Sequence, residues 1–349
     1  MHYVLLFSIF ALLCNATSYR DIRRFISVHF AVLKEHFGLR WKKAPAFTTV
    51  RYIIQGVHSE ELEAAFRGFT QSMVQYNSSE TLLAIAVDGK TLRGSADHFC
   101  ESEALHKLMF FDTEQHLILG HVEVGEKTNE IPLVQALLKE LELQNALFTL
   151  DAMPCQKKTF QAAGETHGLL VQIKENQQEL LKDVRCMARR ARPTDSYQAP
   201  LCCGHGRLEK RTTAVYGGRL CEELLDEQWA ALLKTIVCVH RCFEVWESKT
   251  KQYRHWEERS YYLSNRTLSA PAAHHLVQGH WSIENKNHHL RAVTLLEDQS
   301  RIGKNPFNVS VLRSFALNVL RKNKVHNIRA ELFENSLNWQ RIYRYPQAC

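Results

Sequence analysis

Hydrophobic residues recur every three or four positions through the first part of the chain, which predicts amphipathic helices. The spacing is clear through Ile22, Phe25, Ile26 and Phe30, and it continues over residues 50–57 and 60–73. We therefore predict an N-terminal helical domain over residues 1–78.

The apolar stretch at residues 3–14 resembles the hydrophobic segment of a signal peptide. No Lys or Arg precedes it, and it is shorter than the roughly 20 residues that cross a bilayer. We interpret it as a core helix, and we expect Ser18 to cap the helix that follows. No other segment indicates membrane insertion.

Short β-rich runs alternate with helical patterns after residue 79. The run at residues 81–87 ends on Asp88, and a second run at residues 146–150 ends on Asp151. Further strands are expected at residues 104–111, 117–124 and 169–173, with helices after Pro132 and from residue 157. Such an order predicts an α/β fold in which helices cover a mixed sheet and ligands bind at the carboxyl ends of strands.

Strand-like patterns dominate residues 193–264, and helical spacing returns at residues 272–297 and 309–323. This change from helical to strand-like patterns and back predicts a β-rich insertion within the α/β core. We expect the helical domain at residues 1–78 and the first part of the core at residues 79–192. The insertion is expected at residues 193–266, the second part of the core at residues 267–325 and a tail at residues 326–349.

Composition and charge exclude few classes of function. A formal net charge of +7 favours a polyanionic partner, although many proteins with such a charge bind none. The ten cysteines include no paired C-x-x-C units at zinc-finger separation. We interpret them as free thiols in a reducing cytoplasm.

The two aspartates at strand ends are the first candidates for chemistry. An isolated Asp after a strand usually has no catalytic role, but metal-dependent phosphoryl transfer needs several carboxylates around hard cations. Glu284, on a predicted helix in the segment HWSIEN, is the best third candidate. Glu297 and Asp298 are also acidic, and spacing alone does not choose among the three.

Eight sequence blocks occur along the chain in the same order as the signatures of bacterial insertion-sequence transposases. They are IAVDGKTLRGS, EKTNEIP, TLDAMPCQK, VQIKENQQEL, GHGRLEKR, RSYYLSN, GHWSIENKNHHL and EDQSRIGKN. More narrowly, they resemble the H-repeat-associated group of DDE transposases. The resemblance covers nearly the whole chain, to a helix that ends near Arg321.

The resemblance implies an RNase H-like catalytic core, interrupted by a β-rich insertion. It implies that Asp88, Asp151 and Glu284 are catalytic and bind two Mg²⁺ or Mn²⁺ ions. The expected reactions are strand cleavage and strand transfer on double-stranded DNA, at the inverted-repeat ends of the element and in target DNA. The resemblance further implies a homodimer when the two ends are brought together, acting in the bacterial cytoplasm on the nucleoid.

Polar residues in the same blocks are candidate DNA contacts, each of which can instead belong to a solvated loop, a helix cap or a folded β surface. We predict His280 to be structural and Trp281 to be a core residue of the glutamate helix. The candidate DNA contacts are Lys90, Arg93, Lys127, Lys174, Asn176, His205, Arg207, Arg211, His288 and Arg291.

Two features depart from the family pattern. Members of the group carry a further stretch before the first helix, which implies a truncated start here. They also have an aspartate where this chain has Ala292. These departures favour an alternative in which the chain is a catalytically impaired or domesticated relic that binds DNA without cutting it.

Overall fold

The computed structural model describes residues 1–74, 82–96, 103–125, 130–140, 145–204, 207–217, 226–247 and 250–346. The predicted contacts Lys127 and His205 lie outside these residues. Two units are present. The first comprises Met1–Gln75, Gly89–Lys127 and Ile283–Cys349, and the second comprises Tyr76–Asp88 and Thr128–Ser282. The five domain boundaries expected from the sequence stay a prediction.

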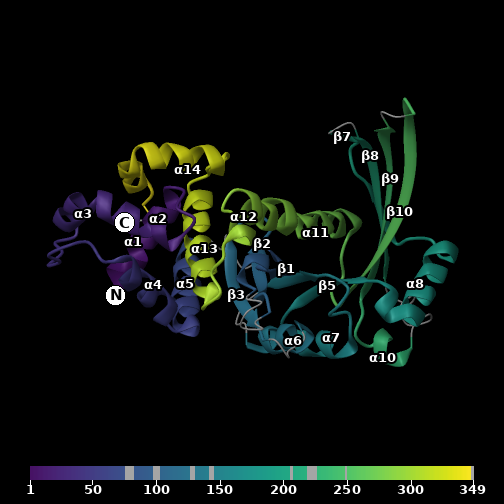
Figure 1. The fold of residues 1–349 in the computed structure, drawn as a ribbon. Helices are drawn as coiled ribbons and strands as arrows, with labels where there is room; N and C mark the ends of the chain where they lie inside the picture. The colour runs from purple at the N-terminus through teal and green to yellow at the C-terminus, as the bar shows by residue number, and fades with distance from the viewer. Residues whose placement is uncertain are drawn as a thin grey trace. The chain divides into compact units, whose positions relative to one another are not determined.

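The strands hydrogen-bond in the order β3-β2-β1-β4-β5-β10-β9-β8-β6, and β7 pairs with β8 (Figure 1). The pairs β1–β4 and β4–β5 are parallel, whereas β2–β3, β5–β10 and the pairs from β10 to β6 are antiparallel. This confirms a mixed α/β fold. The strands are β1 (Leu83–Thr91), β2 (His106–Asp112), β3 (Ile118–Val124), β4 (Ala146–Leu150), β5 (Gly168–Ile173), β6 (Asp195–Gln198), β7 (Cys202–Gly204), β8 (Arg207–Gly217), β9 (Thr235–Glu247) and β10 (Gln252–Ser264).

Helices cover both faces of the sheet in the second unit. Helix α11 (Ala270–Ile283) lies on one face, and α6 (Glu130–Glu140) and α7 (Lys157–Ala163) lie on the other (Figure 1). Every residue of β4 and β5 is buried as a result, which explains their continuous apolar sequence. The remaining helices of this unit are η2 (Glu175–Gln177), α8 (Gln178–Arg190) and α10 (Glu227–Ala230).

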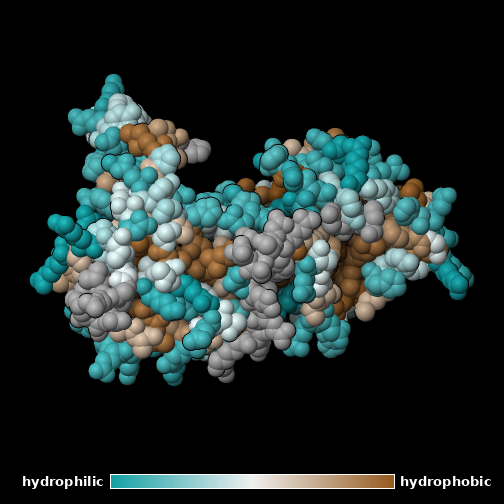
Figure 2. All heavy atoms as spheres, turned by 180° about the vertical axis from the view of Figure 1, so that it is seen from behind, coloured by the Kyte–Doolittle hydropathy of each residue, from teal (hydrophilic) through white to brown (hydrophobic). Residues whose placement is uncertain are grey.

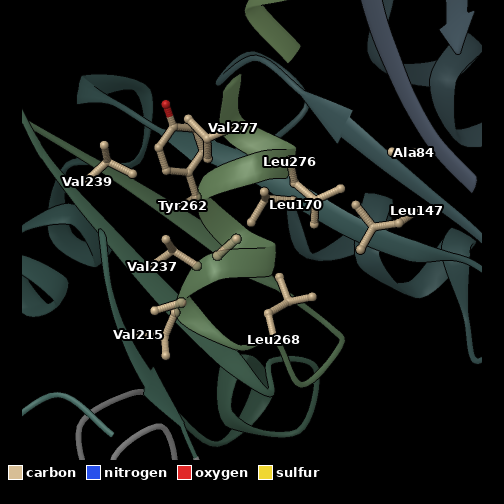
Figure 3. Close-up of a cluster of buried hydrophobic side chains, with 12 residues drawn as sticks. Ala84, Leu147, Leu170, Val215, Val237, Val239, Tyr262, Leu268, Leu276 and Val277 are labelled. Carbon is tan, nitrogen blue, oxygen red and sulfur yellow. The ribbon is translucent and has the colours of Figure 1, made fainter. Parts of the chain in front are cut away.

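The core of the second unit forms between α11 and the strands (Figure 3). Leu276 and Val277 of α11 share this cluster with side chains from six strands, β1, β4, β5, β8, β9 and β10. Strands of the β-rich segment thus share a core with the parallel strands. The cluster comprises Ala84, Leu147, Leu170, Val215, Val237, Val239, Tyr262, Leu268, Ala270, Ala273, Leu276 and Val277.

The predicted N-terminal helices are present in the first unit. Helix α1 is buried through Phe7, Phe10 and Leu13, which are each 0% exposed, so the apolar N-terminal stretch is a core helix as predicted. Ser18 caps α2 in a reciprocal capping box with Asp21. The helices are α1 (His2–Leu13), α2 (Tyr19–Val28), α3 (Phe30–His36), α4 (Phe47–Gly56) and α5 (Ser59–Met73).

Helix α13 (Pro306–Lys322) joins the N-terminal helices of this unit to its β hairpin. The Asn318 amide donates to the Ile118 carbonyl at 2.8 Å and to the Thr70 hydroxyl at 3.2 Å, and its oxygen accepts from the Ile118 N–H at 3.0 Å. Other elements of the unit are η1 (Arg93–Ser95), the π-helical turn η3 (Glu284–His288), α12 (His289–Val293), η4 (Glu297–Gln299), α14 (Ile328–Leu337) and η5 (Trp339–Arg344).

Replacement of Leu276 by Ala tests the core under α11. Leu276 is 5% exposed, so Leu276→Ala is expected to cost about 2–5 kcal/mol of unfolding free energy through lost transfer energy and a residual cavity. Urea unfolding monitored by circular dichroism measures this cost. Gln278→Ala, at an exposed position of the same helix, is the matched control, and equal midpoints for the two variants would contradict the assigned packing.

Candidate active site

Asp88 and Asp151 lie at matching positions of two neighbouring parallel strands. The register of β1 and β4 pairs Val87 with Leu150, and each aspartate is the next residue along its strand. Because adjacent strands are about 4.8 Å apart, the two carboxylates emerge side by side. Asp88 is half-buried and Asp151 is exposed.

Strand β1 does not end before Asp88, as the sequence suggested, but continues to Thr91. The cause is its neighbour β2. Beyond Asp88 the backbone still has a partner segment, and the Leu92 N–H donates to the Leu105 carbonyl at 2.8 Å just before β2 begins. Tertiary pairing therefore extends the strand past the Asp-Gly that resembled a turn.

Two predicted DNA contacts hold the segment around Asp151. The Lys174 ammonium donates to the Asp151 carboxylate at 2.9 Å, and the Asn176 amide donates to the Ala152 carbonyl at 2.7 Å. Lys174 and Asp151 are each about half exposed, so their ion pair contributes little stability. Contact of Lys174 and Asn176 with DNA stays a prediction.

His280 of α11 faces the two aspartates. Its Nδ1 is 2.9 Å from the Thr149 hydroxyl, two residues before Asp151. Burial lowers the pKa of His280, whereas the Asp88 and Asp151 carboxylates act in the opposite direction. The imidazole is therefore neutral at pH 7, which fits a structural role. Trp281 is 45% exposed, so the prediction of a core position for it is wrong.

Glu284 opens the π-helical turn that follows α11 without a break. Such turns are rare and frequently occur at functional sites. The Glu284 side chain is exposed, and that of His288 is 6% exposed. His288 is therefore buried, and its contact with DNA stays a prediction. Glu284 belongs to the first unit and the aspartates to the second, so the trio stays a prediction.

Glu297, one of the alternatives to Glu284, is fully buried and bound to cations. The Arg291 Nε and Nη2 donate to its two carboxylate oxygens at 2.7 and 2.6 Å, and the Lys107 ammonium lies 3.6 Å away. Burial raises the pKa of Glu297, but Arg291 and Lys107 outweigh burial and hold it well below the ordinary value. Arg291 is 0% exposed and has a protein partner, and its contact with DNA stays a prediction.

The polar cluster around Glu297 extends across the first unit. The Arg291 Nη1 donates to the Ser314 hydroxyl at 2.7 Å, and this hydroxyl lies 2.8 Å from His121 Nε2. His121 Nδ1 is 2.9 Å from Glu63 of α5. Hydrogen bonds thus run from α12 through α13 and β3 to α5.

Asp298, the other alternative, pairs with a predicted DNA contact. Its carboxylate lies 3.2 Å from the Lys90 ammonium. The Lys90 side chain is only 9% exposed, so the structure gives it a protein partner in place of the predicted DNA phosphate. Arg93, three residues later, is exposed.

The β8–β10 ribbon presents charged and aromatic side chains. Arg211 and Arg241 both donate to Glu209, the Arg241 bond being 2.9 Å, and together they lower the Glu209 pKa to about 2 against the opposing effect of burial. Hydrophobic side chains lie among hydrophilic ones on the face of the ribbon in Figure 2. Exposed aromatics include Trp246 and Trp256.

No group of three or more His, Cys, Asp or Glu side chains that could hold a metal ion occurs among the residues that the structure describes. A search of the same residues for a helix long and apolar enough to cross a membrane also finds none.

Comparison with known proteins identifies the family. The family model described as "Transposase DDE domain" matches residues 80–318, and the model described as "DDE_Tnp_1-associated" matches residues 1–70. YbfL and the H repeat-associated protein YhhI, both of Escherichia coli K12, are each 29% identical to this chain over 330 residues, which is 92% of this chain and 85% of each relative.

A solved piggyBac transposase synaptic complex with hairpin DNA aligns over 95% of this chain and 70% of that chain, with a TM-score of 0.41 and 12% identity. A similarity at this level is too low to define a shared fold. The class of protein is set by the family model, which spans the residues from just before the first strand to Asn318 within α13. The chain belongs to the DDE transposase family.

Removal of the Glu297 charge tests the buried cluster. Glu297→Gln leaves Arg291 without its buried counterion and should cost about 3–5 kcal/mol of unfolding free energy at pH 7. Since the folded-state pKa of Glu297 is depressed, its contribution is present above the ordinary pKa of 4.5 and is lost as pH falls below it. The difference between native and variant proteins should therefore shrink on acidification.

Urea unfolding at a series of pH values measures this effect. Glu334→Gln, which removes an exposed carboxylate paired with Arg341, is the control and should cost less than about 1 kcal/mol. A Glu297→Gln cost as small as the control, or one unchanged by pH, would refute the assigned role of the pair.

Proposed function

We propose that this transposase-family chain cleaves and transfers DNA strands at the ends of an insertion sequence, with Asp88, Asp151 and Glu284 as its metal-binding carboxylates. The observation that supports this most directly is the register of β1 and β4, which brings Asp88 and Asp151 side by side. Family membership supports DNA as the substrate class.

The donor groups fit a divalent cation. Carboxylate oxygens are hard ligands that Mg²⁺ and Mn²⁺ accept, and two on adjacent strands can share a cation. When bound, divalent metal would activate a water or 3′-hydroxyl and stabilise the leaving oxygen of the phosphodiester.

Three observations support Glu284 as the third carboxylate. It follows His280 by four residues, and residues at this spacing lie on one face of a helix. Its side chain is exposed, whereas Glu297 is buried against Arg291. The third observation is that Asp298 is engaged by Lys90. Glu297 and Asp298, the two alternatives that the sequence left open, are therefore each paired with a cationic side chain of the protein.

Exposed basic residues supply the means to hold the phosphate backbone. Arg93 is exposed on the segment that follows β1, and Lys174 is exposed directly after β5, where it pairs with Asp151. Contacts to phosphate position DNA without reading its sequence. We propose these residues as DNA contacts, with Arg207 and Arg211 from β8 as further ones, and a homodimer as the form that brings two DNA ends together.

Neutralisation of each carboxylate tests the proposed function. Asp88→Asn, Asp151→Asn and Glu284→Gln keep side-chain size and remove one negative charge, so each should lower metal-dependent cleavage by at least about a hundredfold, as expected when a shared metal site is disrupted. The assay follows cleavage of a DNA fragment carrying the inverted repeats that flank this coding sequence, with Mg²⁺, Mn²⁺ or a chelator.

Asp183→Asn is the matched control, because Asp183 is an exposed aspartate of α8 in the second unit. It should cleave like the native chain. A variant of the trio that retains full metal-dependent cleavage would remove its residue from the site. Repeat binding without cutting by native protein would instead support the impaired relic that Ala292 favours.

The ion pair between Lys174 and Asp151 should compete with cation binding. Lys174→Met removes the positive charge 2.9 Å from the carboxylate, so Mn²⁺ should bind up to about fivefold more tightly, consistent with the small energy of an exposed pair. Titration followed by the electron paramagnetic resonance of free Mn²⁺ measures the change. Weaker binding in this variant would show that Lys174 supports the Asp151 geometry.

A further inference from the structure

Two adjacent acidic residues of η4 engage two different segments of the first unit. Glu297 binds Arg291 of α12, and Asp298 binds Lys90 near the end of β1. The first segment continues the helix that begins with Glu284, and the second is the strand that carries Asp88 two residues earlier. We call Lys90, Arg291, Glu297 and Asp298 the η4 clasp.

Arg291 anchors the helical side of the clasp firmly. Beyond its two bonds to Glu297, its Nη2 donates to the Ser310 carbonyl and hydroxyl, both at 2.8 Å, and its Nη1 donates to Ser314. A planar guanidinium held by a bidentate carboxylate and α13 has a fixed orientation. The helix α12 that continues the turn from Glu284 therefore contains an immobilised residue.

The strand side of the clasp also depends on particular residues, Lys90 and Gly94. Lys90 and Asp88 are two residues apart in β1, so their side chains lie on the same face of the strand. Just after the strand, a Cβ on Gly94 would lie 2.6 Å from the Ser300 carbonyl oxygen and 2.8 Å from that of Asp298. Only glycine allows this close approach of the η1 backbone to η4.

The backbone entering η4 is strained. Leu296 has φ 49° and ψ 35°, a left-handed conformation that is unfavourable for a non-glycine residue. Such a conformation persists when the surrounding contacts determine it. Here it places Glu297 and Asp298 so that one carboxylate meets α12 and the next meets β1.

We propose that the η4 clasp fixes the helical segment that begins at Glu284 to the end of β1 at Lys90, with Asp298 and Lys90 as positioning residues for Glu284. This inference rests on the proposed function. Asp298 and Glu297 act through Lys90 and Arg291 and do not themselves bind the metal. Loosening the clasp should therefore weaken the contribution of Glu284 to metal binding and leave that of the aspartates unchanged.

A double-mutant cycle on Mn²⁺ affinity tests the proposal without using catalysis. The full-length native chain, Glu284→Gln, Asp298→Asn and the double variant are titrated with Mn²⁺, and free Mn²⁺ is followed by electron paramagnetic resonance. Asp298→Asn should weaken binding about tenfold, as loss of an outer partner of a metal ligand does. In the Glu284→Gln background the same change should have no further effect, because no carboxylate remains to be positioned.

Two more variants distinguish an effect on the position of Glu284 from an effect of the Lys90 charge and from a loss of folding. Lys90→Met breaks the same contact and leaves no unpaired buried ammonium. It should weaken Mn²⁺ binding if the contact positions Glu284, but strengthen it if only the positive charge of Lys90 matters. Asp298→Glu keeps the carboxylate and should restore most of the affinity. Thermal unfolding by circular dichroism establishes that each variant is folded.

The outcomes separate the two proposals. If Glu284→Gln leaves Mn²⁺ binding unchanged, the trio is wrong and the positioning proposal falls with it. If Glu284→Gln weakens binding but Asp298→Asn and Lys90→Met do not, only the positioning proposal is overturned. Equal effects of Asp298→Asn in both backgrounds would also overturn it, since its effect would then be independent of Glu284.

Discussion

The first unit depends on a carboxylate that is removed from water. Glu297 is fully buried, and its desolvation is offset by a bidentate guanidinium from Arg291 and by the ammonium of Lys107. Ser314 and His121 extend the same network to α5. Since each partner comes from a different segment, the network forms only when the helix after Glu284, the hairpin and α13 are all in place.

In the second unit, the register of the backbone strands positions the candidate residues. In the first unit, buried charged groups hold the segments together. Asp88 and Asp151 are adjacent because β1 and β4 are parallel and paired up to Val87 and Leu150, and the apolar core beneath α11 holds that pairing. No side-chain contact between the aspartates is required. Carboxylates that would repel each other can therefore be held close by the sheet, which is the condition that a shared cation needs.

The sequence predicted the helices and strands whose hydrophobic patterns are local. It did not predict strand ends or side-chain partners that depend on a segment distant in the sequence. The runs before Asp88 and Asp151 are apolar because both faces of their strands are covered, so their strands were predictable. The extension of β1 was not, because it depends on β2. Arg291 resembled a DNA contact because nothing local indicates that Ser310 and Ser314, a turn apart on α13, would enclose it. The assignment of the catalytic trio came from resemblance and stays a prediction.

The electrostatics of the acidic residues also explain why spacing alone could not choose the third carboxylate. Glu284, Glu297 and Asp298 are equally acidic in the sequence, but a metal ligand must exchange water for the cation. Glu297 is committed to Arg291, and the replacement of that guanidinium by a metal would leave Arg291 buried without a counterion, at a cost of several kcal/mol. Asp298 holds a largely buried Lys90 in the same way. Glu284 is exposed to solvent, so a cation can reach its carboxylate from water.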